Sequence, residues 1–336
     1  MVSILRPLTV EAALADGLTP HENGRGEKFV QLYQRLPLGE WFYTSFEKNY
    51  DTDAGVRFAR EHMALPVILC VIYLALIYQC SRFMYRPGQQ RFDLRYPLAY
   101  WNAALSLFSF LGAMRTVPEL IYRLGSANSV LETISANPAS SWGVGATGLW
   151  VQLFIYSKIP ELVDTAFIVA RQRPLLFLHW YHHVTVLLYC WHSYATEAPQ
   201  ALYFVAMNYT VHSIMYGYYC LMALKMKPAW LPPVIITVAQ ISQMVVGVAV
   251  QLGASYRWFT EGSGAPGTGL VNGANVFWGG VMYASYFLLF AKFAYDRYFV
   301  NSKKNGKKAP SSSSLQSAAA SSAAAFEKAV ASKKTA

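Results

Sequence analysis

Three histidines near the middle of the chain have a spacing that suits chemistry at a buried site. His179, His182 and His183 stand three and four residues apart, so a helix would place all three on one side. A neutral imidazole can attack a carbonyl carbon or bind a metal ion, and burial favours the neutral form. On a buried helix, these side chains therefore predict a reaction centre.

Other polar residues occur in the neighbouring apolar segments. They are Lys158, Glu161, Asp164, Asn208, His212, Gln240 and Gln243. An ionisable side chain in hydrocarbon costs roughly 2.5–3.5 kcal/mol on insertion scales, so it generally serves a function. Each residue also has a structural explanation: the lysine and the carboxylates can form buried ion pairs, and the glutamines can join two helices.

The depth of these residues in their segments predicts that they meet. At 1.5 Å per residue, His182 lies about 12 Å and His212 about 15 Å from the same end of a helical bundle. Glu161, Asp164 and Gln240 lie about 10–15 Å from that end. We therefore expect one buried polar site in the cytosolic half of the bundle.

The elements that must position these residues are long and apolar. Hydrophobic residues make up 54% of the 336-residue chain and charged residues 14%, whereas an ordinary soluble domain has about 25% charged residues. Seven runs approach the ~20 residues that a helix needs to cross hydrocarbon. They are residues 64–81, 97–114, 147–170, 175–194, 201–222, 231–254 and 274–296. The sequence thus predicts an all-α membrane protein with seven transmembrane helices.

The charges between these segments predict the orientation. Lysine and arginine concentrate in the loops after the first, third and fifth segments and in the C-terminal tail. Since basic loops stay in the cytosol, the C-terminus should be cytosolic and the N-terminus lumenal. The net charge of +10 therefore reflects membrane topology and not a nucleic-acid surface. The four cysteines fall in or beside apolar runs and suggest no disulfide framework.

Three regions are expected along the chain. Residues 1–62 should form a lumenal or interfacial N-terminal region, residues 63–298 the membrane domain, and residues 299–336 a disordered basic cytosolic tail. The chain ends Lys333-Lys334-Thr335-Ala336, which resembles the dilysine retrieval signal of endoplasmic-reticulum membrane proteins. We therefore expect the chain in that membrane.

The residues alone leave two chemistries open for the histidines. Membrane desaturases and hydroxylases hold two irons in several histidine boxes, but here His21, His62 and His192 lie away from the cluster. A di-iron centre is therefore disfavoured, while a single ion with mixed ligands stays open. Alternatively, one histidine is a nucleophile, and amides with a second histidine donate hydrogen bonds to a developing oxyanion.

At these residues the sequence resembles the ELO family of fatty-acid elongases, the 3-oxoacyl-CoA synthases of the endoplasmic reticulum. The resemblance rests on an ordered series of motifs, Lys158–Thr165, Phe177–His183, Met207–Tyr216 and Thr237–Gln243. It implies condensation of a long-chain acyl-CoA with malonyl-CoA, which releases carbon dioxide and CoA and lengthens the chain by two carbons. It also implies seven helices, six of which enclose a tunnel for the acyl chain.

The resemblance also implies roles for individual residues. His182 would accept the acyl group beside His179 and His183, His212 would assist the second half-reaction, and Asn208 and Gln240 would polarise carbonyl groups. Lys158, Glu161, Asp164 and Gln243 would orient and support this site. The basic residues of the cytosolic mouth would bind CoA phosphates or set the topology; they are Arg171, Arg173, Lys225 and Lys227.

No metal and no cofactor besides the two CoA substrates is expected. The residues around Trp180 and Tyr181 look most like those of elongases of saturated and monounsaturated C16–C18 chains, with polyunsaturated C18 chains as the alternative. The expected partners are membrane lipid and the other enzymes of an elongation cycle, and a homodimer is compatible with the sequence. The competing hypotheses are a histidine-box desaturase or hydroxylase and a seven-span receptor or transporter.

Overall fold

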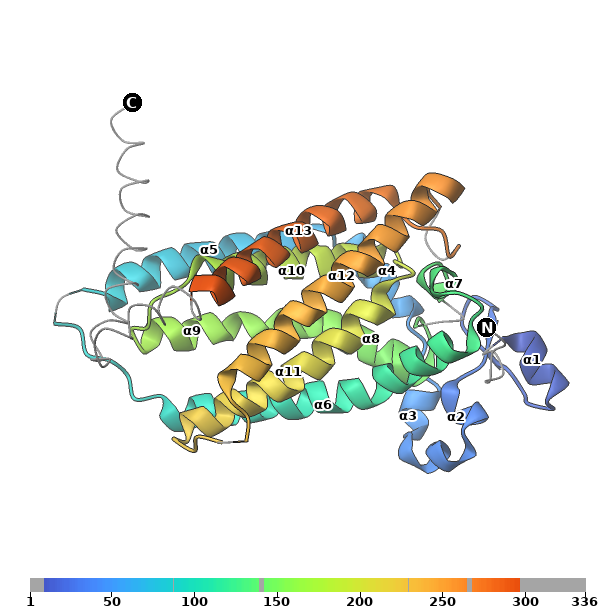
Figure 1. Cartoon of the computed structure of the whole chain (residues 1–336), viewed down its shortest axis with the longest axis horizontal. Helices are drawn as coiled ribbons and strands as arrows, with labels where there is room; N and C mark the ends of the chain where they lie inside the picture. The colour runs from blue at the N-terminus through green and yellow to red at the C-terminus, as the bar shows by residue number, and fades with distance from the viewer. Residues whose placement is uncertain (1–8, 87, 139–141, 229, 265–267, 297–336) are drawn as a thin grey trace.

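The computed structural model describes residues 9–86, 88–138, 142–228, 230–264 and 268–296 (Figure 1). In these ranges the chain is nearly all helical, with one two-stranded hairpin. The predicted apolar segments recur as α5 (Ala64–Met84), α6 (Arg95–Ser126), α8 (Gly145–Ser157) with α9 (Val163–Ala170), α10 (Phe177–Ala195), α11 (Ala201–Ala223), α12 (Pro233–Glu261) and α13 (Gly273–Tyr295). The all-α fold class is confirmed.

Four of these helices, α5, α6, α12 and α13, are long and apolar enough to cross a membrane. The pair α8 and α9 is interrupted by the short 3-10 helix η3 (Pro160–Leu162), and α10 and α11 carry the histidines. The chain is thus a multi-span membrane protein, and the total of seven crossings stays a prediction. The predicted tail 299–336, with Lys333 and Lys334, lies outside the described residues.

A proline causes the interruption between α8 and α9. Pro160 has no N–H to continue the helical hydrogen bonds, and its ring clashes with the preceding turn of a regular helix. The chain passes instead through one tighter 3-10 turn. Lys158 caps the end of α8, and Glu161 lies inside η3. The interruption therefore coincides with part of the predicted polar site.

Helices α9, α10 and α11 are each followed by a residue in the left-handed region. Gln172, Glu197 and Lys225 have φ values of 50°, 51° and 63°, which a residue with a Cβ atom adopts at a cost. The amide of the next residue then bonds back to a helix carbonyl, as in a Schellman motif. These bonds run from Arg173 to Ile168, from Ala198 to Ser193 and from Met226 to Leu221. The chain thus reverses tightly after three consecutive helices.

Residues 9–61 fold into a small unit, which we call the cap, at one end of the long helices (Figure 1). It contains α1 (Val10–Ala15), β1 (His21–Glu22), β2 (Lys28–Phe29), α2 (Leu32–Arg35), η1 (Pro37–Phe42), α3 (Ser45–Lys48) and α4 (Asp53–Glu61). The short helix α7 (Val130–Ile134) lies near the same end. The placement of the N-terminal region at the membrane and its boundary at residue 62 stay predictions.

A buried ion pair joins the cap to two long helices. Glu47 of α3 accepts hydrogen bonds from Arg115 Nε of α6 at 2.8 Å and from Trp150 Nε1 of α8 at 2.9 Å. Burial alone would raise the pKa of Glu47, but hydrogen bonds from Arg115, the Thr44 backbone and Trp150 outweigh it and lower the pKa to about 2. Glu47 is therefore held as a carboxylate that anchors α3.

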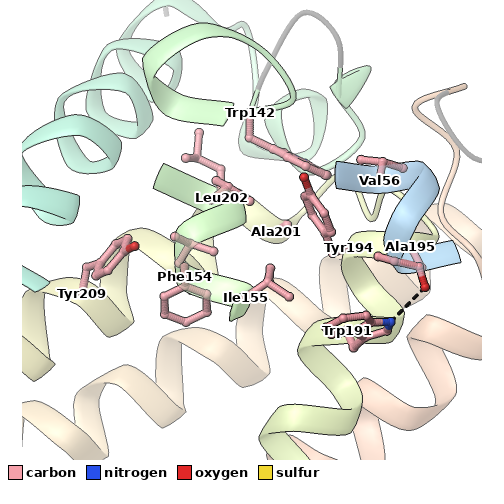
Figure 2. Packing of buried hydrophobic residues seen from close by; sticks show 13 residues of the cluster. Val56, Trp142, Phe154, Ile155, Trp191, Tyr194, Ala195, Ala201, Leu202 and Tyr209 are labelled. Carbon is pink, nitrogen blue, oxygen red and sulfur yellow. Dashed lines mark hydrogen bonds between the residues drawn. The ribbon is translucent and has the colours of Figure 1, made fainter. Parts of the chain in front are cut away.

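A second connection runs through the aromatic core between α4, α8, α10 and α11 (Figure 2). Trp191 of α10 packs in this core and donates from Nε1 to the backbone oxygen of Ala59 in α4 at 2.9 Å. Just beyond α10, Glu197 pairs with Arg25 at 2.9 Å and with Arg60 at 3.0 Å. Helix α10 is thus fixed at its cap end, and its histidine cluster lies toward its other end.

Candidate active site

His182 of α10 lines a narrow internal cavity. The centroid of its ring lies 5.1 Å from that of Tyr286 in α13, and the Tyr286 hydroxyl donates to the His182 backbone oxygen at 3.2 Å. In the described part of the chain, no side chain hydrogen-bonds the imidazole nitrogens of His182. This imidazole is therefore available to a group inside the cavity.

The other two histidines of the cluster have different surroundings. His179 Nε2 lies 2.9 Å from the Thr165 hydroxyl of α9, and this hydroxyl lies 2.7 Å from that of Tyr73 in α5. His183 is buried, with its ring centroid 4.5 Å from that of His179 and 5.6 Å from that of His182. Its Nδ1 has no hydrogen-bond partner among the described residues. The three rings thus pack on one side of α10, as their spacing predicts.

A buried hydrogen-bond chain links the helix interruption at η3 to α11. Lys158 Nζ donates to Glu161 Oε1 at 2.7 Å and to Asn208 Oδ1 at 3.4 Å. Asn208 Nδ2 lies 3.2 Å from His212 Nε2. Lys158 is 2% exposed and Glu161 3% exposed, so the ion pair is shielded from water. Four of the polar residues that the sequence analysis singled out are therefore linked by a chain of contacts.

Asp164 has other hydrogen-bond partners than this chain. Its carboxylate accepts hydrogen bonds from Trp101 Nε1 of α6 at 2.6 Å and from the Tyr216 hydroxyl of α11 at 2.7 Å. The Tyr216 ring in turn lies edge-on to the His212 ring, with centroids 5.3 Å apart. The structure therefore places Asp164 against α6 and α11, and its expected role in orienting the α10 histidines stays a prediction.

The two glutamines of α12 occupy different positions. Gln243 is buried and lines the cavity together with Asn208 and His182. Gln240 donates from Nε2 to the sulfur of Met215 in α11 at 3.3 Å. Gln243 is thus nearer to the cavity-facing histidine, whereas the Gln240 amide joins α12 to α11.

The predicted basic mouth lies at the end of the helices opposite the cap. Arg171 and Arg173 belong to the turn between α9 and α10, and Lys225 and Lys227 to the turn between α11 and α12 (Figure 1). The two lysines and Arg173 are exposed, and Arg171 is half-buried. The Arg173 carbonyl accepts a hydrogen bond from the Tyr85 hydroxyl. All four residues thus lie beyond the helix ends nearest to the histidine cluster.

The cavity has a volume of about 60 Å³ and runs along α10 from His182 to Ser193. That stretch of helix is about 16 Å long. Between its ends the lining is largely aromatic and aliphatic, and includes Phe154, Val186 and Phe204. The described lining comes from five helices, α8 and α10 to α13, whereas six were expected to enclose the tunnel; α6 packs against α8 and α11.

Several contacts at the site were not predicted. Tyr73, Trp101 and Tyr286 each bond a predicted site residue or its neighbour. In the sequence each is an aromatic residue within an apolar run, which is typical of ordinary core packing. Only Thr165 had a signal, because it ends the first quoted motif. The described residues bring no three His, Cys, Asp or Glu side chains together in a way that could hold a metal ion.

Comparison with known proteins agrees with the resemblance seen in the motifs. The profile of the ELO: GNS1/SUR4 family matches residues 58–308. "Very long chain fatty acid elongase 6" of Drosophila melanogaster is 40% identical over 256 residues, which cover 75% of this chain and 78% of that protein.

Two further relatives extend this agreement. "Putative fatty acid elongase 3" of Caenorhabditis elegans is 36% identical over 79% of both chains. "Very long chain fatty acid elongase 6" of Gallus gallus is 35% identical over 78% of this chain and 95% of its own length. The matches argue against the receptor, transporter and desaturase hypotheses. The chain therefore belongs to the GNS1/SUR4 family, the ELO family of fatty-acid elongases.

Proposed function

We propose that this elongase condenses acyl-CoA with malonyl-CoA in two half-reactions, with the acyl group held on His182 between them. The observation that carries the proposal is the position of the His182 ring. It lines the cavity, and its nitrogens form no hydrogen bond with any described side chain, whereas His179 and His212 are both hydrogen-bonded. A nucleophile needs such a free lone pair.

In the first half-reaction, an unprotonated nitrogen of His182 attacks the thioester carbonyl carbon. The carbon–sulfur bond breaks, the proton of the other ring nitrogen passes to the departing CoA sulfur, and an acyl-imidazole remains. The apolar lining between His182 and Ser193 contacts the part of the hydrocarbon chain that lies next to the carbonyl group. The burial of this part supplies binding energy of roughly 0.8 kcal/mol per methylene.

In the second half-reaction, malonyl-CoA loses carbon dioxide, and the resulting carbanion attacks the acyl carbon. The carbon–nitrogen bond breaks, the imidazolate of His182 takes up a proton from solvent to regenerate the neutral ring, and 3-oxoacyl-CoA leaves. Asn208 and His212, supported by the Lys158 ammonium at 3.4 Å from the Asn208 oxygen, stabilise the enolate charge that decarboxylation produces. Gln243 and Gln240 assist from α12.

We also propose the substrate, location and partners, on the basis of the motif resemblance and the distribution of basic residues. We assign a saturated or monounsaturated C16–C18 acyl-CoA as the substrate, because the residues around Trp180 and Tyr181 resemble those of elongases of such chains, and we assign no metal or other cofactor. The basic residues beyond the helix ends meet the CoA phosphates at the cytosolic face of the endoplasmic reticulum, with the N-terminus lumenal and the C-terminus cytosolic. The reductases and dehydratase of the elongation cycle process the product.

Intact-protein mass spectrometry tests the covalent step. Purified enzyme treated with palmitoyl-CoA alone should release CoA and gain one acyl group, because a ping-pong reaction does not need its second substrate for the first step. The His182→Ala variant should form no adduct, and His212→Ala should form it but consume it slowly once malonyl-CoA is added. His62→Ala, which removes an exposed histidine of the cap end, is the matched control.

The same assay separates the alternatives. An active preparation with an unmodified mass after palmitoyl-CoA treatment would leave His182 as a general base and refute the covalent step. Condensation should persist in the presence of a metal chelator, and loss of activity that added metal restores would revive the single-ion hypothesis.

A further inference from the structure

Helix α5 contacts the site through one tyrosine. It packs against α9 and α10, and most of its apolar side chains are exposed, as expected for a helix that faces lipid. Tyr73 is an exception with 6% exposure, and its hydroxyl lies 2.7 Å from that of Thr165. The Thr165 hydroxyl is also 2.9 Å from His179 Nε2. Three helices thus meet in one short chain of hydrogen bonds.

The surroundings of this chain determine its direction. Among the described residues, the Tyr73 hydroxyl has no partner other than Thr165, so accepting a bond would leave its own buried proton without an acceptor. Tyr73 therefore donates to Thr165, and the Thr165 hydroxyl donates its own proton to His179 Nε2. Since Nε2 accepts, neutral His179 carries its proton on Nδ1.

We infer that Tyr73 is a positioning residue for acyl transfer, which acts through Thr165 to fix the orientation and tautomer of His179. His179 lies one helical turn before His182. A fixed Nδ1–H group at this position can stabilise the negative oxygen that forms when the thioester carbonyl is attacked. The inference rests on the proposed transfer of the acyl group to His182.

Removing the Tyr73 hydroxyl alone tests the inference. In Tyr73→Phe, single-turnover transfer from palmitoyl-CoA should slow about fivefold, the effect expected from losing one neutral hydrogen bond. The KM for palmitoyl-CoA should not change, because Tyr73 does not line the cavity in the described structure. Tyr78→Phe is the matched control: it makes the same change on the same helix, at a residue that is 49% exposed, and it should leave the rate unchanged.

Two substitutions of Thr165 separate positioning from packing. Thr165→Ser keeps the hydroxyl and should retain nearly the wild-type rate, whereas Thr165→Val removes it and should be slower than Tyr73→Phe. The double variant Tyr73→Phe/Thr165→Val should be no slower than Thr165→Val alone, since both changes interrupt one chain. If Thr165→Val does not fold, the rates of Tyr73→Phe, its control Tyr78→Phe and Thr165→Ser still test whether the hydroxyl groups matter.

Two results would overturn the inference: a Tyr73→Phe variant as fast as Tyr78→Phe, or rate effects of the Tyr73 and Thr165 changes that multiply. Failure of the proposed covalent mechanism has a different signature, because then the wild-type enzyme turns over without an acyl adduct. In that event the kcat of the whole condensation is compared among the same variants. If the effects of the Tyr73 and Thr165 substitutions on kcat do not multiply, the positioning role is supported. If the two effects multiply, it is contradicted.

Discussion

The buried Lys158–Glu161 pair makes each of its members sensitive to the loss of the other. In Glu161→Gln the Lys158 ammonium, 2% exposed, would lose its counter-ion, and breaking a buried pair in this way costs about 3–5 kcal/mol of unfolding free energy. Thermal unfolding of the detergent-purified variant measures this loss. Replacing both residues, as in Lys158→Met/Glu161→Leu, should recover most of the stability but not the activity, because Asn208 then lacks its ammonium donor.

An unchanged unfolding temperature in Glu161→Gln would show that water reaches the pair.

The same residues illustrate what spacing and depth can predict. Depth placed Glu161 and His212 at a similar level, and the structure links these two residues through Lys158 and Asn208. Depth along a helix does not predict which neighbouring helix a side chain faces. Asp164, at a similar level, therefore forms its hydrogen bonds with Trp101 and Tyr216 and not with the other polar residues of the site.

At the scale of the elements, the left-handed residues after α9, α10 and α11 offer a test of backbone strain. Lys225 has a φ of 63°, and glycine adopts this conformation without the steric penalty of a Cβ atom. Lys225→Gly should therefore raise the free energy of unfolding by about 0.5–1 kcal/mol. Lys225→Ala keeps the Cβ atom and should give no such gain, as measured by thermal unfolding.

The pair of variants also reports on CoA binding. A higher KM for palmitoyl-CoA in both would support phosphate binding by Lys225, and an unchanged KM in both would leave this lysine as a topology determinant. A loss of stability in Lys225→Gly would contradict the strain argument.

The elements themselves were largely readable from hydropathy. The predicted segment 201–222 matches α11 (Ala201–Ala223), and 274–296 matches α13 (Gly273–Tyr295). Helix α6 continues well past the predicted 97–114, to Ser126, because it leaves the apolar segment and reaches the cap with Arg115. The left-handed residues that end α9, α10 and α11 were not predictable, since none of them is the glycine that usually marks such a helix end.

For the molecule as a whole, the attachment of the cap should depend on pH. The folded-state pKa of Glu47 is lowered to about 2 from an ordinary value of 4.5. The stabilisation from this carboxylate is therefore fully present above pH 4.5 and is lost as the pH falls toward 2. In hydrogen exchange followed by mass spectrometry, the protection of α3 relative to the intrinsic exchange rate at each pH should stay high at neutral pH and fall only over this acid range.

Arg115→Ala should produce the same detachment at neutral pH, because it leaves Glu47 buried without its partner. Lys292→Ala breaks an exposed pair with Asp296 and is the matched control. Slow exchange in α3 of Arg115→Ala would mean that other contacts hold the cap.

The composition of the sequence distinguished this region but could not predict how it packs, because the ion pairs Glu47–Arg115 and Arg25–Glu197 join residues far apart in the chain.

The tight turns between α9, α10 and α11 also have a consequence for how the chain enters a membrane during synthesis. Residues 171–176 and 196–200 are all that separate these helices, so helices that cross the membrane as predicted would each enter beside the next. Placing a single helix that carries Lys158 and Glu161, or three histidines, in lipid costs free energy because these polar side chains lose their contacts with water. Entering as adjacent hairpins lets these groups pair before lipid surrounds them. We therefore expect this part of the chain to enter the membrane as one unit.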